Sequence, residues 1–141
     1  MAELDPLIRV RKHDVEQKQK MLAELFRNAE ALKDRRDTLE TQLAIESEKI
    51  KDLDIEMVGF FAPYADSVHT QIEGIDEDRK KLEVCINMAQ DDMRGAYAEL
   101  KKIEIISERR RVEALAELDK KESDELDEIA INMFIRKNED D

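Results

Sequence analysis

The sequence has little of what an ordinary globular core is built from. Its 141 residues include three Gly, two Pro, four Phe, two Tyr and no Trp. Charged residues make up 43% of the chain and hydrophobic residues 41%, which suits a narrow apolar seam flanked by solvated faces. A long helix or a coiled coil is therefore the first expectation.

Other absences exclude classes of function. The net charge of -12 argues against a nucleic-acid partner, because DNA and RNA attract basic surfaces. A lone Cys85 offers no disulfide framework, and the first residues lack a secretory signal, so we expect a reducing cytoplasm. The longest mainly apolar stretch, Met57 to Ala65, falls well short of the roughly 20 residues that a membrane-spanning helix needs.

No pattern in the sequence predicts catalysis, a metal or a cofactor. Gly59, Gly74 and Gly95 lie too far apart for a phosphate-binding loop. Asp66 and His69 have the i, i+3 spacing of helical di-metal sites, but those sites need a second such pair and further carboxylates. Three further candidates lack the partners that a nucleophile or a calcium loop requires, namely His13, Cys85 and the acidic run Asp52 to Glu56. We do not expect an enzyme.

Heptad repeats dominate what is present. Asp5 before Pro6 predicts a helix start, and about eight heptads follow. Their core positions hold Leu4, Arg11, Lys18, Leu25, Leu32, Leu39, Glu46, Leu53 and Phe60, alternating with Ile8, Val15, Leu22, Ala29, Arg36, Leu43, Ile50 and Met57. A second seam holds Val68, Ile72, Ile75, Arg79, Leu82, Ile86, Ala89, Met93, Ala96, Leu100 and Ile103. Its phase slips beyond Ile103.

Gly59 and Pro63 are the only helix breakers near mid-chain, so they predict the turn. We expect an all-α fold of residues 1–141: helix one over about 5–58, a turn over about 59–66, helix two over about 67–135, and a frayed tail at 136–141. Neither helix can hide its seam alone. The two are therefore predicted to form an antiparallel coiled-coil hairpin with a C-terminal helical overhang.

A turn near Pro63 predicts that residue i faces about residue 127 minus i. This register can be checked on the charged seam positions, each of which then meets an opposite charge. It brings Arg36 near Asp91 and Asp92, Glu46 near Lys80 and Lys81, Lys18 near Glu108, and Arg11 near Glu117.

The same register leaves the end of helix two uncovered. Leu4 would face about Ser123, so residues beyond that point have no partner within the chain. The apolar residues of this overhang follow the spacing of an amphipathic helix, and they are Leu126, Ile129, Ala130, Met133 and Phe134. We expect a partner protein or a second copy to cover them.

Two smaller features have two interpretations each. The aromatic residues Phe60, Phe61 and Tyr64 either close the hairpin end or form a candidate docking tip. The triplet Arg109, Arg110 and Arg111 is either a solvated face at the phase slip or a contact for an acidic partner.

The chain resembles the flagellar type III export ATPase stalk protein family, usually called FliJ. The likeness spans nearly the whole sequence. It is densest in "LDPLIRVRKHDVEQKQKMLAEL" from Leu4 to Leu25, in "YAELKKIEIISERRR" from Tyr97 to Arg111, and in "ELDEIA" from Glu125 to Ala130. The aromatic turn "FFAPY" has no counterpart in the family pattern.

This resemblance implies a cytoplasmic central stalk, peripheral at the cytoplasmic side of the inner membrane. Such a stalk binds a hexameric export ATPase, promotes its assembly and activity, links it to the membrane export gate protein, and contacts export chaperones. The likeness implies that Ile8, Val15, Leu126, Ile129 and Met133 enter the ATPase ring.

Two other functional classes remain open. A prefoldin-like holdase also uses a helical hairpin, but it needs β-hairpins, and the connection from Val58 to Asp66 has no alternating strands. A structural coiled coil with no ATPase partner fits the heptads as well. It would form a stable oligomer and leave an ATPase unaffected.

Overall fold

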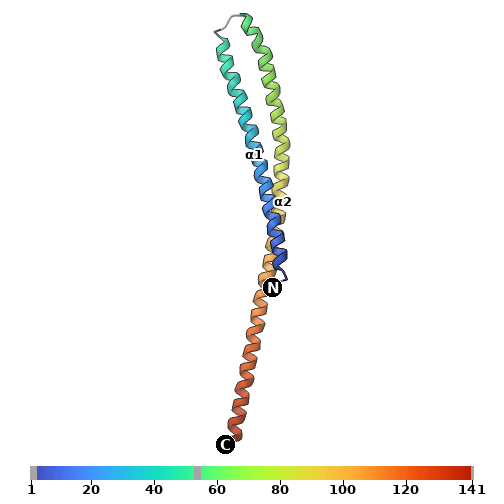
Figure 1. Cartoon of the computed structure of the whole chain (residues 1–141), viewed down its shortest axis with the longest axis vertical. Helices are drawn as coiled ribbons and strands as arrows, with labels where there is room; N and C mark the ends of the chain where they lie inside the picture. Colours follow the sequence, from blue (N-terminus) through green and yellow to red (C-terminus); the bar gives the residue numbers. More distant parts are fainter. Residues whose placement is uncertain (1–2, 53–54, 141) are drawn as a thin grey trace. The chain divides into compact units, whose positions relative to one another are not determined.

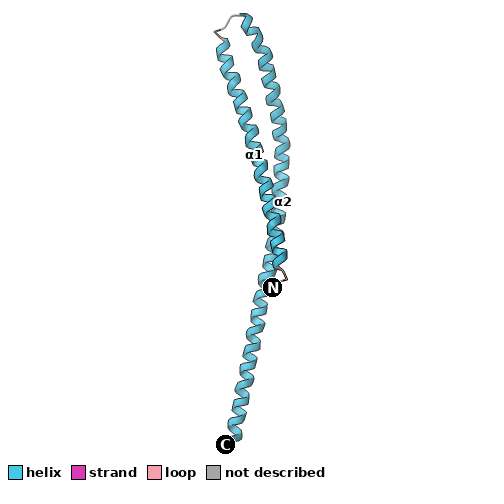
Figure 2. Ribbon diagram, in the orientation of Figure 1, coloured by secondary structure: helices cyan, strands magenta, loops and turns pink. Residues whose placement is uncertain are grey.

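The computed structural model describes residues 3–52 and 55–140 of the chain. Two long helices account for almost all of them: α1 spans Asp5–Ile50 and α2 spans Ile55–Asp140. The described residues contain no β-strand (Figure 2). The expectation of an all-helical chain with two long helices is confirmed.

The helix ends carry charges that suit the helix dipole. Asp5 lies in the first turn of α1, and the Ile8 N–H donates to the Leu4 carbonyl at 2.9 Å, so the helical hydrogen bonds begin at Leu4. Lys49 lies in the last turn of α1. In α2 the corresponding residues are Glu56 and Lys137. Acids at N-termini and bases at C-termini stabilise helices.

The connection between the helices lies earlier in the chain than the sequence analysis expected. Backbone N–H groups of Lys51 and Asp52 donate to the carbonyls of Glu48 and Lys49 at 3.4 and 3.3 Å, closing the last turn of α1. The predicted helix to residue 58, turn at 59–66 and second helix from 67 are therefore wrong, because residues 55–66 are already helical. Leu53, a predicted seam residue, lies outside the described residues.

Both breakers that suggested a turn lie inside α2. Pro63 lacks an N–H and crowds the carbonyl four residues earlier, which belongs to Gly59. The helix nevertheless continues through both residues, and it also extends beyond the predicted end at residue 135, to Asp140. Residues 136–140 of the predicted frayed tail are thus helical, and Asp141 lies outside the described residues.

Contacts divide the chain into two compact units, residues 14–96 and residues 1–13 with 97–141. In the first unit, the two helices lie side by side (Figure 1). Residues 14–21 of α1 share a groove with Ala89 and Asp92, whereas Arg36 to Ser47 share one with His69 and Ile72. Residue numbers in α2 therefore fall as those in α1 rise, which is the order that a helical hairpin requires.

Apolar side chains on the predicted seams fill the interface of this unit. Its buried hydrophobic residues are Val15, Leu22, Val68, Ile72, Ile75, Ala89 and Ala96. All of them belong to the heptad positions identified from the sequence. The predicted faces of both helices are therefore correct, even though the connection between them is not where it was expected.

The register of the two helices differs from the predicted one. The Arg36 Nε–H donates to Asp76 Oδ1 at 2.7 Å, so residue i faces about residue 112 minus i at this point. The predicted value was about 127 minus i, and the pairing of Arg36 with Asp91 and Asp92 is wrong. The connection at residues 51–54 instead of 59–66 moves every facing residue of α2 earlier in the chain.

The other predicted cross-helix charge pairs are replaced by pairs within α1. Lys18 pairs with Asp14 at 3.9 Å, and Lys49 pairs with Glu46 at 3.7 Å. Neither Lys18 nor Glu46 forms the predicted contact with α2. Arg11 is half-buried, and its Nε has no hydrogen-bond partner among the described residues, so the pair with Glu117 is also absent.

The second unit joins the start of α1 to the C-terminal half of α2. Ile8 and Arg11 of α1 are half-buried, as are Ile103 and Ser107 of α2, and Leu100 is buried. Beyond Ser107 every residue from 108 to 139 is exposed. In this unit the cover that α1 provides therefore ends about 16 residues earlier in α2 than the predicted position near Ser123.

Candidate functional site

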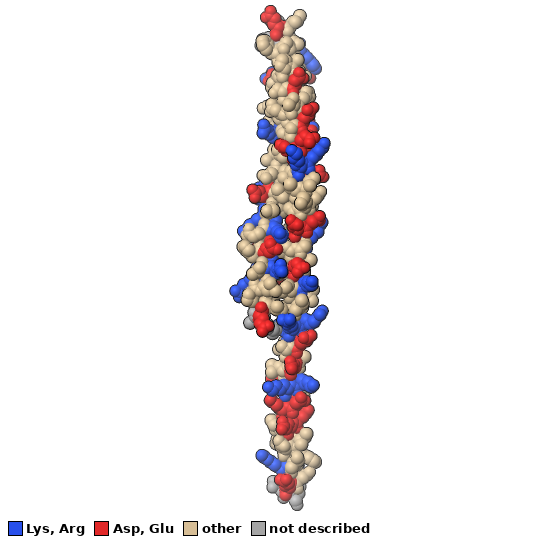
Figure 3. All heavy atoms as spheres, turned by 90° about the vertical axis from the view of Figure 1, so that its right-hand side faces the viewer, with Lys and Arg blue, Asp and Glu red and all other residues tan. Residues whose placement is uncertain are grey.

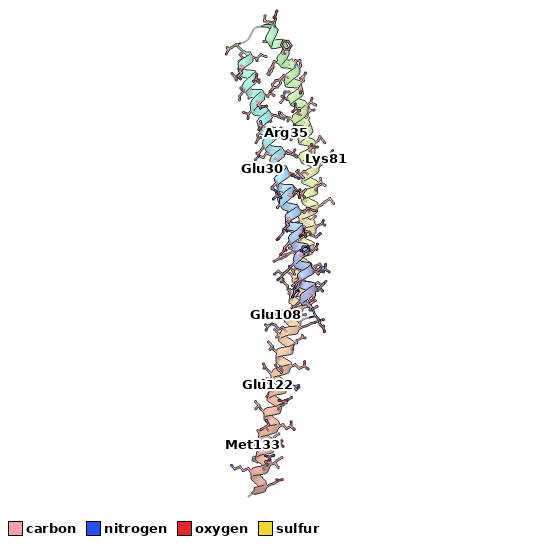
Figure 4. All side chains as sticks on the ribbon, viewed as in Figure 1. Glu30, Arg35, Lys81, Glu108, Glu122 and Met133 are labelled. Atoms are coloured by element: carbon pink, nitrogen blue, oxygen red, sulfur yellow. The ribbon has the colours of Figure 1, made fainter. Side chains whose placement is uncertain are left out.

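We define the C-terminal segment as residues 108–139 of α2, which form a helix with every side chain exposed. Figure 4 labels Glu108, Glu122 and Met133 along it. The segment includes all five residues of the stripe that the sequence predicted. A long uncovered helix is unusual, because most helical stability in proteins comes from packing an apolar face.

The predicted stripe is strongly exposed. Leu126, Ile129, Met133 and Phe134 are between 55% and 66% exposed, and Ala130 is exposed as well. Their spacing of three and four residues puts them on one face of the helix. Each large apolar side chain kept in water forgoes about 2 kcal/mol of burial. The stripe therefore has the geometry of a surface that another helix or a groove would cover.

Several exposed apolar residues of the C-terminal segment were not predicted from the sequence. The wrong register predicted that α1 covers α2 as far as residue 123. Val112, Leu115 and Leu118 were therefore expected to be covered, but all three are exposed. Ile131 and Ile135 are exposed too, and they lie on the other side of the helix from the stripe. The signal that could have placed the connection between the helices correctly was the acidic sequence Asp52-Leu53-Asp54. It contains residues that cap helices, although it has neither Gly nor Pro.

Charged groups near the start of the segment interact within the helix. The Arg111 guanidinium donates to both carboxylate oxygens of Glu108, at 2.6 and 3.0 Å. This hydrogen bonding lowers the pKa of Glu108 and raises that of Arg111. Arg109 and Arg110 form no ion pair among the described residues. The triplet therefore presents two unpaired guanidinium groups to solvent.

A shallow groove precedes the segment and overlaps its start. It is lined by Lys101, Glu104, Ile105, Glu108, Arg109, Val112 and Glu113. Lys101 is held by Glu104 at 3.3 Å, and this hydrogen bond raises the pKa of the ammonium group. The same ammonium lies 5.3 Å from the centre of the Tyr97 ring. The lining of this groove thus combines two apolar side chains with five charged ones.

Two residues that the resemblance assigned to the same site are not on the exposed surface. Val15 is only 7% exposed and is part of the packed seam of its own unit. Ile8 is half-buried in the unit that contains the C-terminal segment. Val15 therefore cannot contact a partner while the seam stays closed.

The aromatic residues of the candidate docking tip lie in the first turns of α2 and not in a turn between helices. Phe60 is 74% exposed, whereas Phe61 is half-buried. The rings of Phe61 and Tyr64 are 6.2 Å apart at an angle of 50°, a tilted contact of the kind that aromatic pairs favour. Phe61 is thus partly sheltered beside Tyr64, whereas Phe60 is largely exposed to solvent, and both interpretations stay open.

A polar contact joins α1 and α2 within residues 14–96. Arg36 donates to Asp76 and also pairs with Glu40 of its own helix. The hydrogen bond from Arg36 lowers the pKa of Asp76 and raises that of Arg36. This ion pair shows which residues of α1 and α2 face one another within residues 14–96.

The described residues contain neither a candidate metal site nor a candidate membrane span. No group of three or more His, Cys, Asp or Glu side chains is placed to hold a metal ion. Neither helix has a described stretch that is long and apolar enough to cross a bilayer.

Comparison with known proteins assigns the family. Neither the curated proteins nor the solved structures include a significant match to this chain. A family model, described as the flagellar FliJ protein, matches residues 1–139. This match spans both helices and the whole C-terminal segment, and it confirms the resemblance noted in the sequence. The chain therefore belongs to the flagellar FliJ protein family, which implies a role related to flagellar export.

Proposed function

We propose that this chain is a non-catalytic, cytoplasmic stalk of the flagellar export apparatus, built as an antiparallel coiled coil of α1 and α2. Family membership over residues 1–139 supports the export role. The opposite order of contacts along the two helices and the heptad spacing of the buried residues support the coiled coil.

The proposed main partner is the hexameric export ATPase, and its proposed site is the C-terminal segment. The main observation in support of this site is an exposed apolar stripe that no described part of the chain covers. The stripe consists of Leu126, Ile129, Ala130, Met133 and Phe134. Half-buried Ile8 lies in the same unit and is the proposed contribution of α1. Binding there would promote ring assembly and hydrolysis.

Two further partners complete the proposal. The stalk would link the ATPase to the membrane export gate protein at the cytoplasmic side of the inner membrane, and it would contact export chaperones. Phe60 and Tyr64, exposed in the first turns of α2, are the proposed docking tip for one of these contacts.

The test measures the hydrolysis rate and hexamer formation of the export ATPase with and without this chain. The test variant is Ile129→Asp with Met133→Asp. Its matched control is Val84→Asp with Met88→Asp, because these residues have the same spacing on α2 and are 58% and 63% exposed. Circular dichroism is expected to give nearly wild-type helicity for both variants, since none of the four side chains is buried.

Stimulation by the wild type and the control variant, lost in the test variant, would support the stalk and its site. No binding and no rate change with the wild-type chain would exclude the ATPase partner. The alternatives would then be a structural coiled coil or a prefoldin-like holdase. Unfolding of the test variant would mean that Ile129 and Met133 belong to the core, contrary to their exposure.

A further inference from the structure

Two acids lie in the middle of the exposed apolar face of the C-terminal segment. At about 100° per residue, Asp119 and Glu122 lie within about 40° of Leu126 around the helix axis. They continue a heptad spacing of three and four residues that begins at Val112. We call this set of exposed residues the C-terminal seam; it consists of Val112, Leu115, Asp119, Glu122, Leu126, Ile129 and Met133.

No base of the helix offsets the charge of these two acids. Residues three and four positions apart are neighbours on a helix surface. At those spacings Asp119 has one charged neighbour, Glu122, and Glu122 has two, Asp119 and Glu125. Neither Asp119 nor Glu122 forms an ion pair among the described residues. By contrast, Glu108 at the start of the segment is held by Arg111 at 2.6 Å.

The nearest bases lie on the other side of the helix. Lys120 and Lys121 are about 120° and 140° away from Leu126 around the axis. Each of them is three or four residues from Glu117 and from Asp124, which are acids of that outer side. Acidic and basic side chains therefore succeed one another along this end of α2 (Figure 3). Bases of the helix thus stand beside acids of the outer side, whereas the acids of the C-terminal seam have no basic neighbour.

A second copy of the segment is a poor occupant of this seam. In a parallel pair of helices, each of the two acids faces its own counterpart. In the antiparallel pair that sets apolar residues against one another, Leu115 faces Leu126 and Asp119 faces Glu122. Sliding that pair by one heptad places both acids against apolar side chains. Each of these arrangements costs either like-charge repulsion or the burial of an unpaired carboxylate.

We propose that Asp119 and Glu122 select the partner of the C-terminal segment. They exclude a second copy of the chain, and they require a partner helix whose apolar stripe carries Lys or Arg opposite the two carboxylates. Charged residues at core positions of paired helices choose partners in this way, at some cost in affinity. This selectivity rests on the proposed function, which makes the segment a binding surface, and it adds the chemistry of the partner.

A charge-reversed copy of this chain is the probe, because it presents the same apolar residues with bases between them. The probe carries Asp119→Lys and Glu122→Lys. In a mixture with the wild type, acids face bases in both the parallel and the antiparallel pair. Sedimentation equilibrium of the full-length chains, alone and mixed, measures the association. The mixture is expected to associate about tenfold more tightly than either chain does alone.

The matched control for the probe is Asp124→Lys with Asp127→Lys. These acids have the same spacing and give the same net charge, but they lie about 160° and 100° from Leu126 around the axis. This control copy is expected to associate with the wild type no more tightly than the wild type does with itself. Lys favours helices more than Asp does, so circular dichroism should show retained helicity.

An apolar replacement tests the exclusion of a second copy. Asp119→Leu with Glu122→Leu makes the seam continuous and is expected to raise self-association above that of the wild type. Asp124→Leu with Asp127→Leu adds the same side chains outside the seam and is expected to raise it less.

No association in the mixture up to hundreds of micromolar would overturn the proposal. So would a wild-type chain that associates with itself as tightly as with the charge-reversed copy, or equal effects of the seam and control variants. Association that depends on reversal within the seam, with self-association gained through the leucine replacements there, would establish it. None of these measurements uses the ATPase, so a selective seam beside an unaffected ATPase would overturn the ATPase partner alone.

Discussion

At the scale of single residues, the helices contain positions that oppose their own stability. Gly74 and Gly95 lie inside α2, and a Cβ built on either residue meets nothing within 4 Å. Glycine costs a helix interior about 1 kcal/mol relative to alanine, because the unfolded chain has more backbone freedom to lose. No contact in the described structure offsets that cost.

Gly74→Ala and Gly95→Ala are each expected to raise the free energy of unfolding by about 1 kcal/mol. Urea melts followed by circular dichroism measure the effect. Ala98→Gly, at an exposed position of the same helix, is the reverse control and should lower stability by a similar amount. A loss of stability in either alanine variant would show that its Cβ meets a neighbour.

The ion pair of Arg36 and Asp76 makes stability depend on pH. The folded-state pKa of Asp76 is below its ordinary value of 3.8, because Arg36 donates a hydrogen bond to the carboxylate. The pair therefore stabilises the fold above the unfolded-state pKa, and its contribution is lost as the pH falls through the folded-state pKa.

Asp76→Asn is accordingly expected to melt at a lower temperature than the wild type at pH 7, and the difference is expected to shrink as the pH falls through the folded-state pKa of Asp76. Both side chains are partly exposed, so the difference at pH 7 should be small. Asp78→Asn, an exposed acid two residues away, serves as the control. A difference that stays constant with pH would mean that the carboxylate acts through shape and not through charge.

At the scale of elements, the sequence predicted the faces of the helices and the start of α1 well, but it placed the connection between the helices and the end of α2 poorly. Every buried hydrophobic residue lies on a heptad position, because the hydrophobic period follows from helix geometry alone. The register shift of about 15 residues is close to two heptads. Sliding one helix by two heptads keeps apolar residues opposite apolar residues, so the repeat itself cannot fix the register.

The position of the connection determines which residues of the two helices face one another. The residue types that usually mark a turn predicted the wrong position for it. Gly59 and Pro63 predicted a turn, yet both lie within α2. The acids at Asp52 and Asp54 mark the connection more accurately, although such residues are common throughout so charged a chain. The exposed stripe was found in spite of this error, because it lies beyond the cover of α1 in either register.

Pro63 should leave the first turns of α2 weakly held. It is the ninth residue of the helix, where the missing hydrogen bond and the clash with Gly59 cost about 3 kcal/mol. Pro63→Ala is expected to slow amide hydrogen exchange over residues 58–66. Pro6→Ala is the matched control: Pro6 is the second residue of α1, where its N–H would have no helical acceptor, so little change is expected. Equal effects of the two variants would contradict this explanation.

At the scale of the whole molecule, burial is distributed unevenly along the sequence. The buried residues fall between Val15 and Leu100, whereas residues 108–139 are all exposed. Local opening is easiest where few apolar contacts must be broken. Stability should therefore be concentrated in one part of each helix and be nearly absent from the C-terminal segment of the isolated monomer.

Hydrogen exchange on a dilute sample is expected to give strong protection over residues 68–100 of α2 and weak protection over 108–139. Uniform protection along α2 would contradict the exposure of the C-terminal segment.

The short connection between the helices also sets the order in which the chain can fold. Contacts between the end of α1 and the start of α2 join parts of the chain that are close in sequence, so forming them loses little loop entropy. Val68, Ile72 and Ile75, which lie soon after that connection, are among the most buried side chains, so the first contacts are already favourable. Folding should then proceed as a zipper from the connection toward Val15, faster than the chain's length alone would suggest.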